Sequence, residues 1–121
     1  MEAKEKELIR GGQFIVKESN CEDIFTPEDF TEEQKMMKNA VMEFNDREVI
    51  PFRDRFENKD YAFTEEVMRK AGELGFLGVA VPEAYGGLGM GFVSTLLTCD
   101  YISSGTGSFS TAFGAHTGIG T

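Results

Sequence analysis

The distribution of charge along the chain limits most strongly what this sequence can fold into. All 12 Lys and Arg residues, and 18 of the 21 Asp and Glu residues, lie between residues 1 and 70. Residues 71–121 contain 12 of the 14 glycines, and their only charged residues are Glu73, Glu83 and Asp100. A segment that faces water usually carries far more charge. We therefore expect residues 71–121 to be mostly buried, or to present an apolar face that a partner, a second copy or further chain covers.

Length and composition narrow the class of protein. A chain of 121 residues fits one domain. Its net charge of −9 disfavours binding to nucleic acid, which depends on Lys and Arg neutralising phosphates. The apolar runs are far shorter than the ~20 residues of a membrane span. The N-terminus alternates in charge and resembles no secretory or transit signal. Two cysteines make no disulfide framework, so free thiols and a cytoplasmic location are expected.

Two helices are predicted in the charged part of the chain. Residues 31–34, Thr-Glu-Glu-Gln, form a capping box, and the helix that follows is expected over residues 32–49, ending before Pro51. Thr64 is expected to cap a second helix. Gly75 fits the position just after the end of that helix.

Two further helices are predicted in the part that is poor in charge. Residues 92–103 repeat apolar side chains at helical spacing, and Ser108 is expected to cap a fourth helix. Residues 79–82 are expected to be extended, and residues 13–17 either extended or an apolar plug. Residues 1–10 are either a short helix or a disordered arm. The fold class is therefore all-α, with about four helices and an N-terminal arm.

The local motifs do not by themselves form an active site. The Gly-rich run 86–91 lacks the last glycine of a dinucleotide-binding loop, because Phe92 stands there, so a tight, closely packed turn is favoured. His116 is the only histidine, and with two distant cysteines it cannot complete a metal site. Asp100 is the one acid on an apolar helix, and it either has a buried partner or lies at the rim in solvent.

Residues 76–91, Phe-Leu-Gly-Val-Ala-Val-Pro-Glu-Ala-Tyr-Gly-Gly-Leu-Gly-Met-Gly, join an apolar run to Pro-Glu and then to Gly-Gly-x-Gly. This order of motifs resembles the N-terminal domain of the acyl-CoA dehydrogenase family. Residues 31–34 and 49–51 look like the start and end of its first helix, and residues 113–121 like its fourth helix and exit. The resemblance covers about residues 25–121. Residues 12–27 look most like the very-long-chain subgroup.

The resemblance implies a function and a division of the chain. Residues 1–25 would be an N-terminal arm, and residues 26–121 the helical domain of a three-domain enzyme whose β domain and C-terminal helical domain are absent. Such enzymes are oxidoreductases acting on CH–CH bonds, and they convert fatty acyl-CoA to 2,3-enoyl-CoA in β-oxidation. They bind FAD and pass electrons to an electron-transferring flavoprotein, and a homo-oligomer is expected. The base and most flavin contacts would lie outside this chain, which alone would be inactive.

The same resemblance implies an acyl-chain pocket. The family's fourth helix lines that pocket, and the matching positions here are Thr111, Gly114, Ala115 and Gly118. Tyr85 is expected near the substrate entrance. Small side chains either leave room for a long acyl chain or let helices pack closely. No catalytic, flavin-binding or metal-binding residue can be assigned. The alternative function is a stand-alone helical module that binds an acyl chain or a protein partner without catalysis.

Overall fold

The computed structural model describes residues 8–120, which fall into two units that divide between residues 31 and 32. In the first unit the chain forms three 3₁₀ turns, Gly11–Ile15, Cys21–Asp23 and Pro27–Asp29. Of the two alternatives for residues 13–17, the extended segment is wrong, because this part of the chain has no partner strand among the described residues and closes local hydrogen bonds instead. The expectation for residues 1–10 falls largely on residues 1–7, outside the described part.

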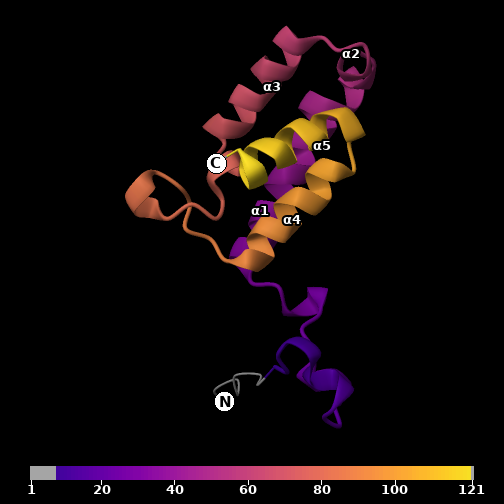
Figure 1. Ribbon diagram of the computed structural model, residues 1–121, viewed down its shortest axis with the longest axis vertical. Helices are drawn as coiled ribbons and strands as arrows, with labels where there is room; N and C mark the ends of the chain where they lie inside the picture. The colour runs from indigo at the N-terminus through magenta and orange to yellow at the C-terminus, as the bar shows by residue number, and fades with distance from the viewer. Residues whose placement is uncertain (1–7, 121) are drawn as a thin grey trace. The chain divides into compact units, whose positions relative to one another are not determined.

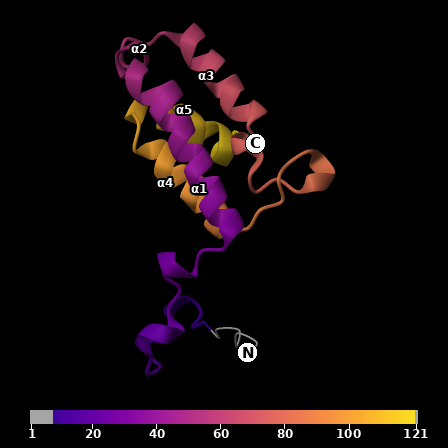
Figure 2. The ribbon, with the colours of Figure 1, turned by 180° about the vertical axis from the view of Figure 1, so that it is seen from behind.

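The second unit contains the helices, and residues 8–120 include no strand. The fold class predicted from the sequence, all-α, is confirmed. In Figures 1 and 2, α1 and α4 lie side by side, and α5 packs beside them. Four helices correspond to those predicted, and α2 is an additional short one. Their bounds are α1 Glu32–Phe44, α2 Arg53–Glu57, α3 Tyr61–Glu73, α4 Phe92–Ser103 and α5 Gly107–Gly114.

Phenylalanine rings from α1, α2, α3, α5 and the turn after α3 make up much of the core of this unit. Phe109 from α5 is fully buried, and it packs against Phe56 from α2 at 5.2 Å between ring centroids. Phe44 from α1 meets Phe76 edge-on at 5.5 Å. Such tilted and edge-on pairs add stability beyond the area that they bury, by about 0.5–1.5 kcal/mol each. The rings therefore fix how the helices pack.

The first helix continues beyond its α-helical part. A π-helical turn, Asn45–Val49, follows α1, then a 3₁₀ turn, Ile50–Phe52, leads into α2. The predicted helical stretch to Val49 is therefore present, but the chain stays helical past Pro51. Proline is tolerated there because it stands in the first positions of the new turn, where its missing N–H costs no hydrogen bond.

The predicted start of the second long helix is wrong. Thr64 lies inside α3, and its hydroxyl donates to the carbonyl of Asp60. Asp60 caps the helix instead, because its carboxylate accepts from the N–H of Phe63 at 3.1 Å. The end is as predicted: Gly75 follows the helix with a φ of +82°, a left-handed conformation that glycine adopts without strain.

The loop before α4 is closed by backbone hydrogen bonds. Residues 79–82 are bends rather than the predicted extended segment, and the N–H groups of residues 88–90 donate to carbonyls of residues 78–81. A Cβ at Gly87 would overlap the carbonyl of Val81, so this position requires glycine. The Gly-rich run is therefore the tight, closely packed turn that the sequence favoured.

The last two helices differ in detail from the prediction. Thr106, not Ser108, is the N-cap residue of α5. Ser108 lies in the first turn and bonds to another helix. On α4 the buried side chains are Ser94, Leu97, Thr98 and Ile102. Asp100 is exposed to solvent, which is the second of the two alternatives that the sequence left open for it.

Candidate functional site

The outer face of α5 carries the residues that the sequence singled out. Thr111, Gly114, Ala115 and Gly118 recur at helical spacing along α5 and the π-helical turn Ala115–Ile119, and all are exposed. A Cβ at Gly114 or Gly118 would meet no heavy atom within 4 Å. Nothing in the described part of the chain therefore requires small residues there for close packing.

Tyr85 stands apart from this face. It lies in the short turn Glu83–Tyr85, and 83% of its surface is exposed. A cavity of about 50 Å³ does join residues 76–81 to α5, but Tyr85 does not line it. The structure thus brings four of the five predicted pocket residues together, and leaves Tyr85 on its own loop.

That cavity includes side chains that sequence reasoning missed. Thr95 and Cys99, one turn apart on α4, face Phe113 and Thr117 across it. Burial raises the pKa of the Cys99 thiol, which keeps it protonated. The sequence did contain a signal for this cavity, because Thr95 and Cys99 are small polar residues spaced four apart on an apolar helix. At about 50 Å³ the cavity is too small for an acyl chain.

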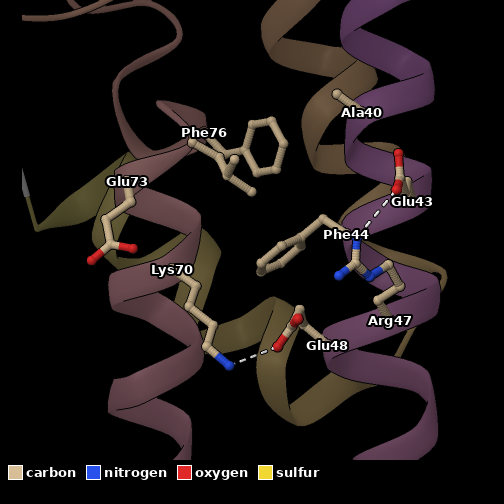
Figure 3. Close-up of a pocket in the computed structure, with 9 residues that line it drawn as sticks. Ala40, Glu43, Phe44, Arg47, Glu48, Lys70, Glu73 and Phe76 are labelled. Atoms are coloured by element: carbon tan, nitrogen blue, oxygen red, sulfur yellow. Dashed lines mark hydrogen bonds and ion pairs between the residues drawn. The ribbon is translucent and has the colours of Figure 1, made fainter.

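A second hollow, which we call the α1–α3 groove, is larger. It consists of two adjoining cavities of about 380 and 350 Å³, which share Ala40, Leu74 and Phe76. In Figure 3, Phe44 and Phe76 point toward each other at its floor. Leu74 and Met36 stand at its edge with 56% and 71% of their surface exposed. The other apolar lining residues are Met37, Leu88 and Met90.

Ion pairs border one end of this groove. Lys70 of α3 reaches Glu48 at 2.8 Å and Glu66 at 3.0 Å, and these carboxylates raise the pKa of Lys70. Glu43 pairs with Arg47 along the opposite helix (Figure 3). Exposed pairs of this kind contribute little to stability. These pairs place three carboxylates beside two cations, so this end of the groove carries a small net negative charge.

The comparisons with known proteins decide the family. Residues 31–121 match the model of the acyl-CoA dehydrogenase N-terminal domain. The chain belongs to the acyl-CoA dehydrogenase family. The match includes the closed loop, α4 and α5, so the face and the groove described above are features of an acyl-CoA dehydrogenase N-terminal domain.

Individual acyl-CoA dehydrogenases agree with this assignment. A probable acyl-CoA dehydrogenase of Bacillus subtilis is 40% identical over 99% of this chain and 20% of its own length. A glutaryl-CoA dehydrogenase of Desulfococcus multivorans is 35% identical over 63% of this chain and 20% of its own. A crystal structure of an acyl-CoA dehydrogenase complexed with FAD, from Bacillus anthracis, superposes with a TM-score of 0.84 at 40% identity, over 92% of this chain and 19% of that one.

This chain therefore spans about a fifth of the length of the acyl-CoA dehydrogenases that it matches. Relatives named for a substrate include glutaryl-CoA and isovaleryl-CoA dehydrogenases. These names give no support to the very-long-chain subgroup suggested by residues 12–27. That assignment stays a prediction.

No flavin contact can be assigned to residues 71–120 of this acyl-CoA dehydrogenase domain. Residues 71–120 contain no Lys or Arg to balance the diphosphate of FAD. The outer face of α5 offers one hydroxyl, and the Thr111 hydroxyl already donates to the carbonyl of Gly107 at 2.8 Å. No step of a flavin reaction can be derived from these residues.

Neither a metal-ligand cluster nor a membrane-spanning helix occurs among residues 8–120. They contain no group of three or more His, Cys, Asp or Glu side chains placed to hold a metal ion. His116 is exposed in the π-helical turn. No helix among these residues is long and apolar enough to cross a membrane.

Proposed function

We propose that this chain is the N-terminal part of an FAD-dependent acyl-CoA dehydrogenase that oxidises fatty acyl-CoA to 2,3-enoyl-CoA in β-oxidation. The observation that carries the proposal is the match of residues 31–121 to the family's N-terminal domain. The similarity to an acyl-CoA dehydrogenase complexed with FAD supports the cofactor. Two free thiols, Cys21 and Cys99, fit a reducing compartment such as the cytoplasm.

The chemistry divides between this chain and the rest of the enzyme. Bound FAD would supply a hydride acceptor next to the β carbon, while a carboxylate base removes the α proton. Base and cofactor must stand on opposite sides of one C–C bond in a dry cleft. None of the three acids in residues 71–120 is assigned as the base. Glu73, Glu83 and Asp100 are each exposed, on three different elements, and not enclosed in a dry cleft. We infer that this chain supplies a wall of the cleft and is inactive alone.

The outer face of α5 is the part of that wall that we assign to the acyl chain. Thr111, Gly114, Ala115 and Gly118 leave space that no described residue fills. We assign Tyr85 to the entrance of the pocket, and the exposure of its ring supports this assignment. The length of acyl chain that the enzyme prefers would depend on how much of the space beside these four residues stays open. The likeness of residues 12–27 to the very-long-chain subgroup supports long chains, and the glutaryl and isovaleryl relatives support short ones.

A panel of substrates tests this proposal. The protein is isolated from its source cells and mixed with saturated acyl-CoAs of increasing length and an artificial electron acceptor, and the products are identified by mass spectrometry. We expect 2,3-enoyl-CoA from at least one length class. Absence of enoyl product from every acyl-CoA would contradict the proposed reaction. The 121-residue chain serves as the inactive control.

A second function is favoured by the α1–α3 groove. Its exposed apolar rim, lined by flexible methionines, fits an apolar side chain from a protein partner. The expected partner of the complete enzyme is an electron-transferring flavoprotein, and this groove is the surface that we would test for it.

Substituting Leu74 tests the docking function. Leu74→Glu puts a charge at the rim without disturbing the core, because this side chain is 56% exposed. We expect at least a tenfold weaker affinity for the partner flavoprotein in a titration, about 1.4 kcal/mol. Tyr61→Glu is the matched control, because Tyr61 is also exposed and begins α3, whereas Leu74 directly follows the end of α3. Equal affinities for the two variants would rule out the groove as the docking site.

A further inference from the structure

Side chains from residues 45–57 bond to the turn between α4 and α5. Asn45 is buried, and its amide nitrogen donates to the carbonyl of Tyr101 at 2.9 Å and to the hydroxyl of Ser104 at 3.1 Å. Arg53 donates to the carbonyl of Gly105 at 2.8 Å. These bonds join segments about fifty residues apart, so the turn is held from outside as well as by its own local hydrogen bonds.

Glu57 extends this connection to the start of α5. Its carboxylate oxygen Oε1 accepts from the hydroxyl of Thr106 at 2.8 Å and from that of Ser108 at 2.9 Å. Thr106 is the N-cap residue of α5, and Ser108 lies in its first turn. A negative charge beside the N-terminus of a helix is also favoured by the helix dipole. One carboxylate therefore holds both sides of the helix start.

The contact with Glu57 adds to the constraints that α5 already has from its packing in the core. Phe109 and Phe113 anchor α5 in the core, but they lie on one side of a helix of eight residues. Ring packing sets how this side meets the neighbouring helices, and the hydrogen bonds from Glu57 add a fixed point at the first turn of α5. A small rotation moves Thr111, Gly114 and Ala115 sideways, because they project from the opposite side.

We propose that Glu57 is a positioning residue for α5, which sets where the small-residue face meets the acyl chain in the complete enzyme. This inference rests on the proposed function, because it concerns the same acyl pocket. Glu57 itself touches no substrate, since its carboxylate faces the start of α5.

Two variants and one matched control test the inference in the protein isolated with its full activity. Glu57→Ala removes both hydrogen bonds, and Glu57→Gln keeps an oxygen acceptor without the charge. Asp54→Asn removes the same charge from the same helix, away from the turn. The two measurements are amide hydrogen exchange across α5, and KM and kcat over a series of acyl-CoA lengths.

We expect Glu57→Ala to speed exchange in the first turn of α5 and to raise KM for long acyl-CoAs several-fold, with kcat for short ones unchanged. Glu57→Gln should lie between Glu57→Ala and wild type, and Asp54→Asn should match wild type. Unchanged exchange, or faster exchange with an unchanged length profile, would overturn the positioning role. A wild type that oxidises no acyl-CoA would contradict the proposed function instead, and the exchange result alone would then decide whether Glu57 holds α5.

Discussion

Gly105 is a residue at which the turn between α4 and α5 lies very close to the π-helical turn Asn45–Val49. A Cβ there would overlap the side-chain oxygen of Asn45 and would stand 2.9 Å from Cγ1 of Val49. Both neighbours are buried, so they cannot move aside freely. We expect Gly105→Ala to lower the free energy of unfolding by about 1–3 kcal/mol.

Urea unfolding of the 121-residue chain checks this value. Gly114→Ala is the control, because its new Cβ would meet nothing within 4 Å, and alanine favours a helix by up to about 1 kcal/mol over glycine. The two substitutions should therefore move the midpoint in opposite directions. A Gly105→Ala chain as stable as wild type would contradict the close approach.

Asp60 gives the fold an acid-sensitive contact. Its carboxylate pairs with Arg55 at 2.7 Å and caps α3 through the N–H of Phe63, and both interactions lower the pKa of Asp60. Because the folded pKa is lowered, the stabilisation is present above the unfolded pKa of about 3.9, and it is lost as the pH falls through the folded value.

We expect Asp60→Asn to flatten the decline of Tm between about pH 5 and about pH 2, because the variant has no carboxylate to protonate. Thermal unfolding followed by circular dichroism at several pH values measures this decline. Glu65→Gln, an exposed acid on the same helix, should keep the wild-type slope. If the plots of Tm against pH were parallel for wild type and Asp60→Asn, the contacts of Asp60 would not account for the loss of stability in acid.

At the scale of elements, the sequence predicted the helices better than their first residues. The start of α1 at Glu32 and the glycine after α3 follow from strong local signals. Asp60 and Thr64 are both residue types that cap helices. Asp60 is the cap of α3, because the preceding turn places its carboxylate at the start of the helix. Residues 79–82 have strand-like composition but no partner strand, so they bend and bond to their own loop.

The candidate site was predictable only in part, for a similar reason. The spacing of Thr111, Gly114 and Gly118 places them on one face as soon as α5 is recognised. The α1–α3 groove and the part that Glu57 plays depend on which helices meet, and the pattern within one helix does not contain that information. Glu57 lies between the first two predicted helices, where the sequence predicted no helix.

The openness of the α5 face leads to a prediction for the element as a whole. In the complete enzyme, Ala115→Phe should fill the proposed pocket and lower kcat/KM for long acyl-CoAs at least tenfold more than for short ones, a difference of about 1.4 kcal/mol. Steady-state rates over the series of lengths measure this. Met42→Phe, a bulky change at an exposed position on α1, is the control. A length profile that Ala115→Phe leaves unchanged would refute the pocket.

At the scale of the whole molecule, the uneven charge has a visible counterpart in the structure. Residues 71–121 do not bury all of their apolar side chains: Phe92 and Leu96 on α4 are 75% and 52% exposed. We therefore expect the 121-residue chain to self-associate, with a mass by light scattering that rises with concentration. Replacing both residues by serine should reduce the association. A wild-type chain that stays monomeric at every concentration would contradict the prediction that these exposed apolar side chains drive association.

The central claim is that this domain belongs to a flavoenzyme that oxidises acyl-CoA. The measurement that tests it most directly uses the protein captured from its source cells with an antibody to this segment. Its visible absorbance is recorded without oxygen, before and after an acyl-CoA is added. The account predicts a flavin spectrum that bleaches when the acyl-CoA is added. A protein that carries no flavin, or a flavin that no acyl-CoA reduces, would contradict it.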